Sequence, residues 1–422
     1  MLNLIGVVIA FAVIIFLIRK KFNFGISLII GSIILGMFSL QEIQPVDIPK
    51  AMIEASFYSF KTNQITTYTI ELAILLTVIY ILAKLMQETQ SINRLIDSLR
   101  IFFSKGGILA VIPALYGLMP VPGGALFSAP AIDEEGDKYN LSKLQKNFLN
   151  VWFRHIWFPI FPISSAMILI CSDKFSNIED IYQLVVVNIP AFIAAITIGI
   201  IYLKIFVKNK VVIEKEKVDL HGFLYLLPPV VPLVFYVVVS YYFEIDTVRA
   251  FLIGMIVSIV LLYFLLDLSP REYVDKIKKA ITWKLALAIF GIMIFREMFS
   301  ASGADQILAE IIGGLPFAPL FVIVLIPVLL GFLTGYNLGA VALSYPLVEP
   351  FFMSSSINII GISSIIFTAS LAGYLISPIH LCNVLSSEYL KTETTRMYKM
   401  YVPATLFILI VQTIFIVVFF QI

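Results

Sequence analysis

The sequence predicts an all-α, polytopic membrane protein with about ten transmembrane helices and two re-entrant hairpins, arranged as two inverted-topology repeats. Three observations support this class: a strongly apolar composition, ten apolar stretches of membrane-spanning length, and two more that proline and glycine interrupt. Of the 422 residues, 60% are hydrophobic and 13% are charged, whereas a soluble domain carries about 25% charged residues. This charge density excludes a soluble enzyme. The net charge of +2 excludes a basic nucleic-acid-binding surface.

The spans follow from the length of the apolar stretches, because a helix needs about 20 mainly apolar residues to cross the hydrocarbon. The ten predicted spans are Leu2–Ile18, Phe24–Leu40, Thr67–Met86, Asn150–Cys171, Leu184–Phe206, Phe223–Phe243, Val248–Leu266, Leu285–Phe299, Ile359–Leu385 and Val402–Phe420. The stretches Ile108–Ile132 and Pro316–Pro350 contain Pro and Gly at their centres. We expect each of them to form a hairpin that enters and leaves the membrane on the same side.

The basic residues predict the orientation. If both hairpins are re-entrant, most of the 29 Lys and Arg residues fall in one set of loops, and Arg154 remains inside a span. Short cytoplasmic loops are enriched in Lys and Arg, so this set is predicted to be cytoplasmic and both termini extracytoplasmic, in the plasma membrane. A full crossing by either hairpin would remove the asymmetry. The basic residues on the other side are Lys50, Lys61, Lys174, Arg249 and Arg296.

A repeated motif indicates internal symmetry. The pattern G-x-x-x-x-S-x-P occurs at Gly123–Pro130 and again at Gly339–Pro346. A Pro-Ile pair follows each copy inside a later span, first at Pro159 and then at Pro378. Because each repeat has five crossings, an odd number, the second is predicted to lie upside down relative to the first. The predicted units are a first repeat over residues 1–206, a cytoplasmic linker over 207–221 and a second repeat over 222–422.

Proline and glycine break the predicted helices at four places, which correspond in pairs between the repeats. Each unsatisfied backbone group costs several kcal/mol in lipid, so such breaks are tolerated only where they are buried in protein or line a wet cavity. We therefore expect the four breaks to converge on one polar pocket between the repeats. The breaks are Pro120–Gly124, Pro159–Ser165, Gly335–Gly339 and Gly373–Pro378.

The hairpin tips are candidate ligand sites. A half-helix that starts at a tip presents free backbone N–H groups and a partial positive charge, which favours an anion. Nearby carbonyl and hydroxyl oxygens suit a small cation, so Na⁺ or H⁺ is expected as the coupling ion, and no cofactor is predicted. The same small residues could instead serve close helix packing. The candidate substrate-binding residues are Pro122, Gly123, Gly124, Ser128, Arg154, His155, Asn337, Gly339, Ser344, Ser377 and Asn383. The candidate coupling-ion residues are Ser128, Thr334, Asn337 and Ser344.

Arg154 is the one Lys or Arg that cannot be placed in a loop or at the end of a predicted span, and His155 follows it. An ionisable residue at membrane depth is a candidate functional residue, here for an anionic substrate or a gate. Two alternatives stand: Arg154 pairs with a structural carboxylate, such as Glu71 or one of residues 133–135, or it extends to the cytoplasmic surface. His155 and His380 flank the two matched breaks, either as a proton relay or as buried histidines with satisfied hydrogen bonds.

Other polar residues predict no metal site. Cys171 and Cys382 are far apart in the sequence and match neither a disulfide framework nor metal-ligand spacing. The three histidines are also isolated from one another along the chain. The pattern over Ile92–Phe103 predicts an interfacial helix with Leu95 and Leu99 on its apolar face.

The stretch LMPVPGGALFSAP at Leu118–Pro130 and the ten-span plan resemble a prokaryotic integral membrane family of unknown function and, more broadly, the ion transporter superfamily. Relatives in that superfamily include gluconate permeases, citrate transporters, divalent-anion/sodium symporters and arsenite pumps. The resemblance covers essentially the whole chain. It implies a site at the tips Pro122–Gly124 and Asn337–Gly339, a homodimer and an elevator-type movement. The Ser-Asn-Thr signature of the divalent-anion symporters is missing at both tips.

Together these patterns predict a secondary active transporter for a small, anionic, carboxylate-type solute, coupled to an ion gradient. The alternatives are a channel, which shares the broken helices, and a membrane-embedded enzyme. No Walker A, H-E-x-x-H or G-x-S-x-G motif occurs in the sequence, so enzymatic activity is not predicted. The expected partners are a small-molecule solute and the lipid bilayer, without nucleic acid.

Overall fold

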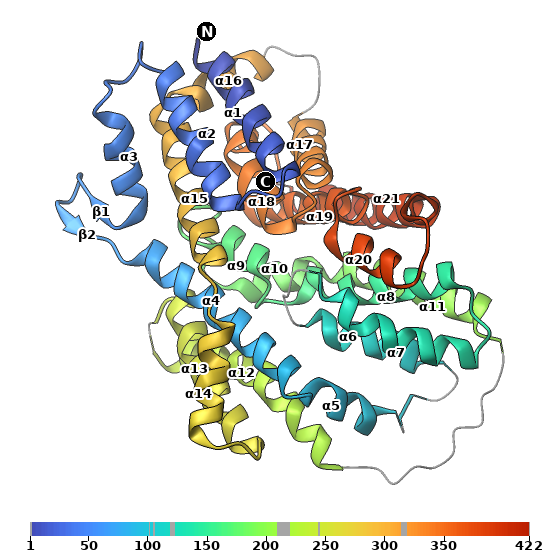
Figure 1. Ribbon diagram of the computed structural model, residues 1–422. Coiled ribbons are helices and arrows are strands. Elements are labelled where there is room, and N and C mark those ends of the chain that lie inside the picture. Colours follow the sequence, from blue (N-terminus) through green and yellow to red (C-terminus); the bar gives the residue numbers. More distant parts are fainter. Residues whose placement is uncertain are drawn as a thin grey trace.

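The computed structural model describes residues 2–421 except 101, 104–105, 119–122, 209–219, 244 and 314–318. In these residues the protein is a helical bundle (Figure 1), with one short antiparallel pair of strands, β1 (Tyr58–Ser59) and β2 (Gln64–Ile65). The predicted all-α, polytopic class is confirmed. The strand pair, which the sequence pattern did not predict, lies in the loop between α3 and α4.

The elements that precede the predicted linker are all helical apart from this strand pair. They are α1 (Leu2–Arg19), α2 (Phe24–Phe38), α3 (Asp47–Ser56), α4 (Tyr68–Glu88), α5 (Ser91–Leu99), α6 (Ile108–Gly117), α7 (Ala125–Lys138), α8 (Lys143–His155), the 3₁₀ helix η1 (Phe158–Ile160), α9 (Ser165–Cys171), α10 (Ile181–Val187) and α11 (Ile189–Phe206). Most of the predicted linker, residues 209–219, lies outside the described residues.

The elements that follow the linker are also helical. They are η2 (Leu220–Leu226), α12 (Leu227–Tyr242), α13 (Thr247–Leu265), α14 (Pro270–Ala280), α15 (Trp283–Ala301), α16 (Ala304–Gly313), α17 (Pro319–Thr334), α18 (Asn337–Val348), η3 (Glu349–Phe351), α19 (Ile359–Leu375), α20 (Leu381–Tyr389) and α21 (Thr394–Phe419).

Seven helical stretches of the described chain are long and apolar enough to cross a membrane: α1, α4, α8 with α9, α11, η2 with α12, α13 and α21. The other predicted spans are helical too, but α2 has 15 residues and α19 has 17, while α15 carries three charged residues. Two predicted boundaries are wrong by a full turn or more. The span expected to begin at Val402 begins at Thr394, as α21. The span expected to begin at Asn150 begins at Lys143, because Ser142 and Gln145 form a capping box there.

Each interrupted stretch forms a helical hairpin of two short arms. The arms are α6 and α7 in the first hairpin, with 10 and 14 residues, and α17 and α18 in the second, with 16 and 12 residues. At a rise of 1.5 Å per residue these arms are about 15 to 24 Å long. They are shorter than the roughly 30 Å hydrocarbon core, as re-entrant hairpins require.

Each hairpin packs on the broken span of its own half of the chain and also contacts the broken span of the other half. Both α6 and α7 contact α8, while α17 and α18 contact α19 (Figure 1). In addition, α7 contacts α20 from the second half of the chain, and α18 contacts α9 from the first. The long helices α4 and α15 pack against each other, with α13 on α4 and α2 on α15. The two halves of the chain are thus interleaved around the broken spans.

The predicted interfacial helix corresponds to α5. Its apolar residues Ile92, Leu95 and Ile96 are buried, and the helix packs on η2 and α6. The polar face carries Asp97, which is exposed and bonded to Arg100. The apolar face expected from the sequence therefore lies against the protein itself.

Candidate functional site

Two membrane helices are interrupted at their prolines. The first ends as α8 at His155, continues through η1, and resumes as α9, whose first turn is capped by the Ser164 side chain. The second ends as α19 at Leu375 and resumes as α20 at Leu381, with Pro378 between them. Proline cannot donate the backbone hydrogen bond that would continue a helix. The two interruptions therefore fall where the sequence predicts them.

The two interruptions meet in the interior. The His155 ring nitrogen Nε2 lies 3.2 Å from the hydroxyl of Tyr374 at the end of α19. The Phe158 and Tyr374 rings stack with an interplanar angle of 9°. The His155 and His380 rings lie edge to face, with centroids 4.8 Å apart. Aromatic and imidazole rings from both halves of the chain thus form the contact between the breaks.

Both hairpin tips reach the same segment. A side-chain carbon built on Gly123 would lie 3.3 Å from Leu381, and one on Gly335 would lie 2.7 Å from Ile379. Both glycines have positive φ angles, +72° and +59°, a conformation that other residues rarely adopt. The Ser377 hydroxyl donates to the Phe332 carbonyl in the second hairpin at 2.6 Å. The described parts of the other three interruptions therefore lie around the second broken span, at residues 374–385.

Arg154 lies at the tip of the first hairpin. Its side chain is 3% exposed, and Nη1 donates to the Tyr116 carbonyl at 2.6 Å. The guanidinium occupies the space beside Gly124, where a Cβ atom would lie 2.0 Å from Nη2. The alternative in which Arg154 reaches the cytoplasmic surface is wrong, because the side chain is enclosed by protein.

Three of the four carboxylates considered as structural partners of Arg154 pair with other basic residues. Glu71 pairs with Arg249 at 2.9 Å. At the C-terminal end of α7, outside the membrane-spanning segments, Asp133 pairs with Lys143 and Lys146. Glu135 pairs with Arg100 and Lys138. Burial raises the pKa of Glu135, but the hydrogen bonds from these two partners outweigh it and hold that pKa below its usual range.

Several predicted ligands are bound within the protein instead. The Ser128 hydroxyl donates to Asn150 Oδ1 at 2.5 Å, and Asn150 Nδ2 donates to Ser386 at 2.8 Å. The Ser344 hydroxyl donates to the Ala340 carbonyl one turn back. The Thr334 hydroxyl donates to the Leu330 carbonyl at 2.7 Å. These hydroxyl groups therefore make hydrogen bonds within or between helices, as expected if the residues serve helix packing.

Other predicted residues keep free polar groups. Asn337 begins α18 and its Oδ1 has no hydrogen-bond partner among the described residues, although the side chain is 5% exposed. Asn383 Nδ2 is likewise buried without a partner in the described chain. Gly339 lies against the ring of Phe24, 2.7 Å from where its Cβ would be. Pro122 lies outside the described residues.

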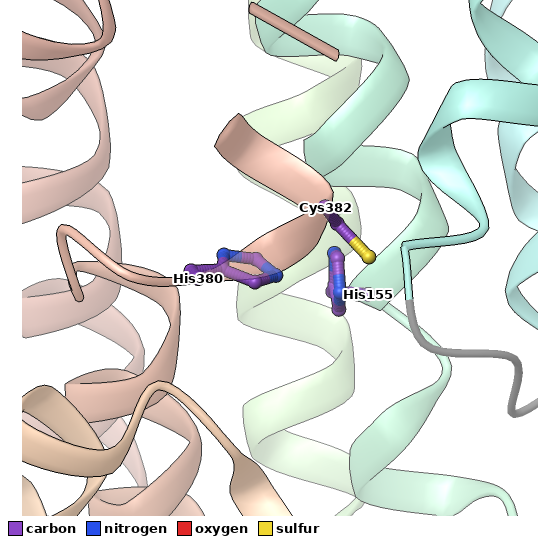
Figure 2. Close-up of side chains that lie close together, drawn as sticks. All are labelled: His155, His380 and Cys382. Carbon is purple, nitrogen blue, oxygen red and sulfur yellow. The ribbon is translucent and has the colours of Figure 1, made fainter. Parts of the chain in front are cut away.

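The structure also gathers residues that the sequence pattern separated. One ligand atom from each of His155, His380 and Cys382 lies within 4.8 Å of the others (Figure 2). Two of the three histidines, His155 and His380, are therefore close in space although they are far apart along the chain, because the two breaks bring them together. Cys382 and Tyr374 were not among the candidates. The H-x-C spacing directly after a break was the signal that could have identified Cys382.

A separate cavity of about 770 Å³ lies near the C-terminal end of α9 and the turn between α12 and α13. Among the described residues, its lining is rich in tyrosine and includes four carboxylates, but no Lys or Arg. The Tyr236 hydroxyl donates to Asp180 there at 3.1 Å. This acidic cavity does not suit an anion, and it does not include the residues around the breaks.

Comparisons place the chain among known proteins. No curated protein matches the sequence. The structure is similar to that of a YdaH transporter from Alcanivorax borkumensis, described as having an unusual topology, with a TM-score of 0.58 and 10% sequence identity. The similarity covers 92% of this chain and 98% of the transporter chain, so the two share an overall fold. A family described as "Protein of unknown function (DUF401)" matches residues 3–419, and the chain belongs to this family.

Proposed function

We propose that the protein is a secondary active transporter for a small anionic, carboxylate-type solute, coupled to an ion gradient. Transport proceeds by alternating access of the elevator type, on the plan of the ion transporter superfamily. The protein acts as a homodimer in the plasma membrane, with both termini extracytoplasmic. The similarity in fold to a transporter over nearly the whole of both chains supports the general class.

The observation that carries the proposal is the position of Arg154. A guanidinium that is 3% exposed lies against the backbone of the first hairpin tip, one residue from the histidine where the two breaks meet. A buried cation at membrane depth is expensive and is usually retained for function. Together with the glycine-lined tip, it supplies what a small carboxylate needs: a fixed charge and close approach to backbone.

The helix contacts support two inverted repeats. If α6, α7, α8, α9 and α11 correspond to α17, α18, α19, α20 and α21, the contact of α6 with α8 maps onto that of α17 with α19. The contact of α7 with α20 likewise maps onto that of α18 with α9, and the pair α11–α21 maps onto itself. The same holds outside the hairpins if α2, α3 and α4 correspond to α13, α14 and α15. The contacts of α4 with α13 and α14 then map onto those of α15 with α2 and α3.

Single residues follow the same symmetry. The separation of Pro159 and Pro378 places His155 and Tyr374 at equivalent positions, and these two side chains contact each other at 3.2 Å. Equivalent residues can touch only near a two-fold axis that relates the repeats. The solute site of the proposal lies on this axis, where alternating-access transporters built from inverted repeats commonly bind their substrate.

The coupling ion is assigned to the second hairpin tip. Asn337 offers a buried amide oxygen that has no partner among the described residues. Amide, carbonyl and hydroxyl oxygens at an interrupted helix are typical ligands for Na⁺. The Thr334 and Ser344 hydroxyls each donate to a backbone carbonyl. In the proposal, the lone pairs of these same hydroxyl oxygens bind the ion.

The experiment is uptake by the purified protein in proteoliposomes, with radiolabelled succinate, citrate, gluconate and acetate as probes. Imposed Na⁺ and H⁺ gradients are compared with no gradient. The proposal expects gradient-driven accumulation of at least one probe, abolished by Arg154→Gln. The matched control is Arg94→Gln, which removes a guanidinium that donates to Tyr225 on the distant α5–η2 contact. Uptake that needs no gradient would favour a channel, and no uptake of any probe would contradict the proposal.

A further inference from the structure

Three potential metal ligands lie together where α8 ends and α20 begins. His155 is the last residue of α8, His380 is the N-cap of α20, and Cys382 lies in the first turn of that helix. None of the three is more than 3% exposed. One ligand atom from each lies within 4.8 Å of the others. Two imidazoles and a thiol are donors that Zn²⁺ and Cu⁺ accept.

The tautomer of His155 suits a ligand. Its Nδ1 lies 2.6 Å from the Val151 carbonyl, which can only accept, so Nδ1 carries the proton. The other nitrogen, Nε2, therefore presents its lone pair toward the cluster. Metal-bound histidines commonly donate their second N–H to a carbonyl, which fixes the ring. In this structure Nε2 lies 3.2 Å from the Tyr374 hydroxyl, a contact that a metal ion can replace.

His380 provides the second, independent observation. Neither of its ring nitrogens has a hydrogen-bond partner in the described part of the chain, although the side chain is fully buried. Buried polar groups are nearly always bonded, so an imidazole with two open nitrogens calls for an explanation. Figure 2 shows the His380 ring turned toward His155, with the Cys382 sulfur near the other side of the His155 ring.

From this geometry we infer that His155, His380 and Cys382 form a binding site for a thiophilic transition-metal ion of the Zn²⁺ class. Binding joins His155 Nε2, one nitrogen of His380 and Cys382 Sγ to the metal. The thiol proton is released to solvent and no electron is transferred, so the site gains one net positive charge. Three protein ligands leave a fourth tetrahedral position open.

The spacing requires only a small adjustment. With zinc–nitrogen distances of about 2.0–2.1 Å and a zinc–sulfur distance of about 2.3 Å, tetrahedral donors lie roughly 3.3–3.7 Å apart. The three donors already lie within 4.8 Å, so side-chain rotation can close the site. Because α8 and α20 come from different halves of the chain, the metal would tie those halves together. The inference does not rest on the proposed transport function.

The test uses the full-length protein in detergent, stripped with chelator and then titrated with Zn²⁺ or Co²⁺. Zinc content is measured after removal of free metal, and Co²⁺ serves as a spectroscopic probe of thiolate coordination. The test variants are Cys382→Ser and His380→Gln. The matched controls are Cys171→Ser, a second buried cysteine, and His221→Gln, an exposed histidine. Size-exclusion profiles of all variants are compared before titration.

The inference predicts one zinc per chain and a thiolate-to-cobalt charge-transfer band in the wild type and both controls. Each test variant should lose the band or the bound metal, with an affinity loss beyond the roughly 10- to 100-fold that outer-shell changes cost. Wild-type protein with no charge-transfer band, or test variants that bind like the controls, would overturn the inference. The cobalt band of the wild type decides the question even if a variant fails to fold.

Discussion

The close contact between α17 and α19 gives a sharp test of the fold around the second break. Gly373 precedes Tyr374, and a Cβ atom at position 373 would lie 2.0 Å from the Val328 carbonyl oxygen. Ordinary contacts begin near 3.4 Å, so Gly373→Ala must push the two helices about 1.4 Å apart. The obstacle is backbone, which cannot rotate away as a side chain does.

The change in the free energy of unfolding caused by Gly373→Ala is the balance of overpacking, which destabilises, and helix propensity, which stabilises. Overpacking of a dense interior costs about 1–3 kcal/mol, and a separation above 1 Å places this site near 3 kcal/mol. Replacing glycine by alanine inside a helix returns about 1 kcal/mol. The expected net destabilisation is therefore about 2 kcal/mol, or a factor of about 30 in the ratio of folded to unfolded protein.

The assay is thermal unfolding in detergent, followed by the fluorescence of tryptophan, since Trp152 is buried. The matched control is Ser363→Ala on the same helix, which removes a buried hydroxyl without a partner among the described residues and should not destabilise the protein. If Gly373→Ala is as stable as the wild type or more so, helix propensity outweighs packing and the close α17–α19 contact is refuted.

Three further outcomes are expected. Gly124→Ala should fold but abolish uptake as Arg154→Gln does, because the new methyl group displaces the guanidinium 2.0 Å away; normal uptake would contradict this position of Arg154. Asn150→Ala should lower the free energy of unfolding by about 1–3 kcal/mol, measured by thermal unfolding, because the Ala125 carbonyl and the Ser386 hydroxyl lose its hydrogen bonds. Glu135 has a lowered pKa in the folded protein, so its stabilising contribution is present above its usual value of 4.5 and is lost as the pH falls through the folded pKa. Apparent melting temperatures measured from neutral to acidic pH should therefore fall less steeply for Glu135→Gln than for the wild type, and equal slopes would contradict the pairing.

Much of the fold could be predicted from the length of the apolar stretches and from the positions of proline and glycine. The broken spans at Pro159 and Pro378 and the hairpin tips near Gly123 and Gly335 were predictable because a missing N–H or a positive φ angle acts locally. The start of α8 was predicted too late, since a polar first turn carries no apolar signal. Its capping box at Ser142 and Gln145 was the local feature that marks the boundary.

The candidate site was harder to predict because its composition depends on tertiary contacts. Arg154 stood out as a charge inside a span, and the structure places it at a hairpin tip. Ser128 matched the repeated motif, but the structure uses it to join α7 to Asn150. His380 and Cys382 contact His155 only because the two halves of the chain pack together. His155 is too far from them in the sequence for a local motif to predict that contact.

The central claim is that the meeting point of the breaks opens alternately to the two sides of the membrane. Cys382 is a native reporter at that point, and Cys171→Ser removes the other cysteine. The measurement is the labelling rate of Cys382 in protein stripped of metal by chelator. A membrane-impermeant methanethiosulfonate is applied separately to each face of oriented proteoliposomes. We predict labelling from both faces, with rates that shift in opposite directions when the ion gradient is reversed. Labelling from neither face under any gradient would contradict alternating access at this site.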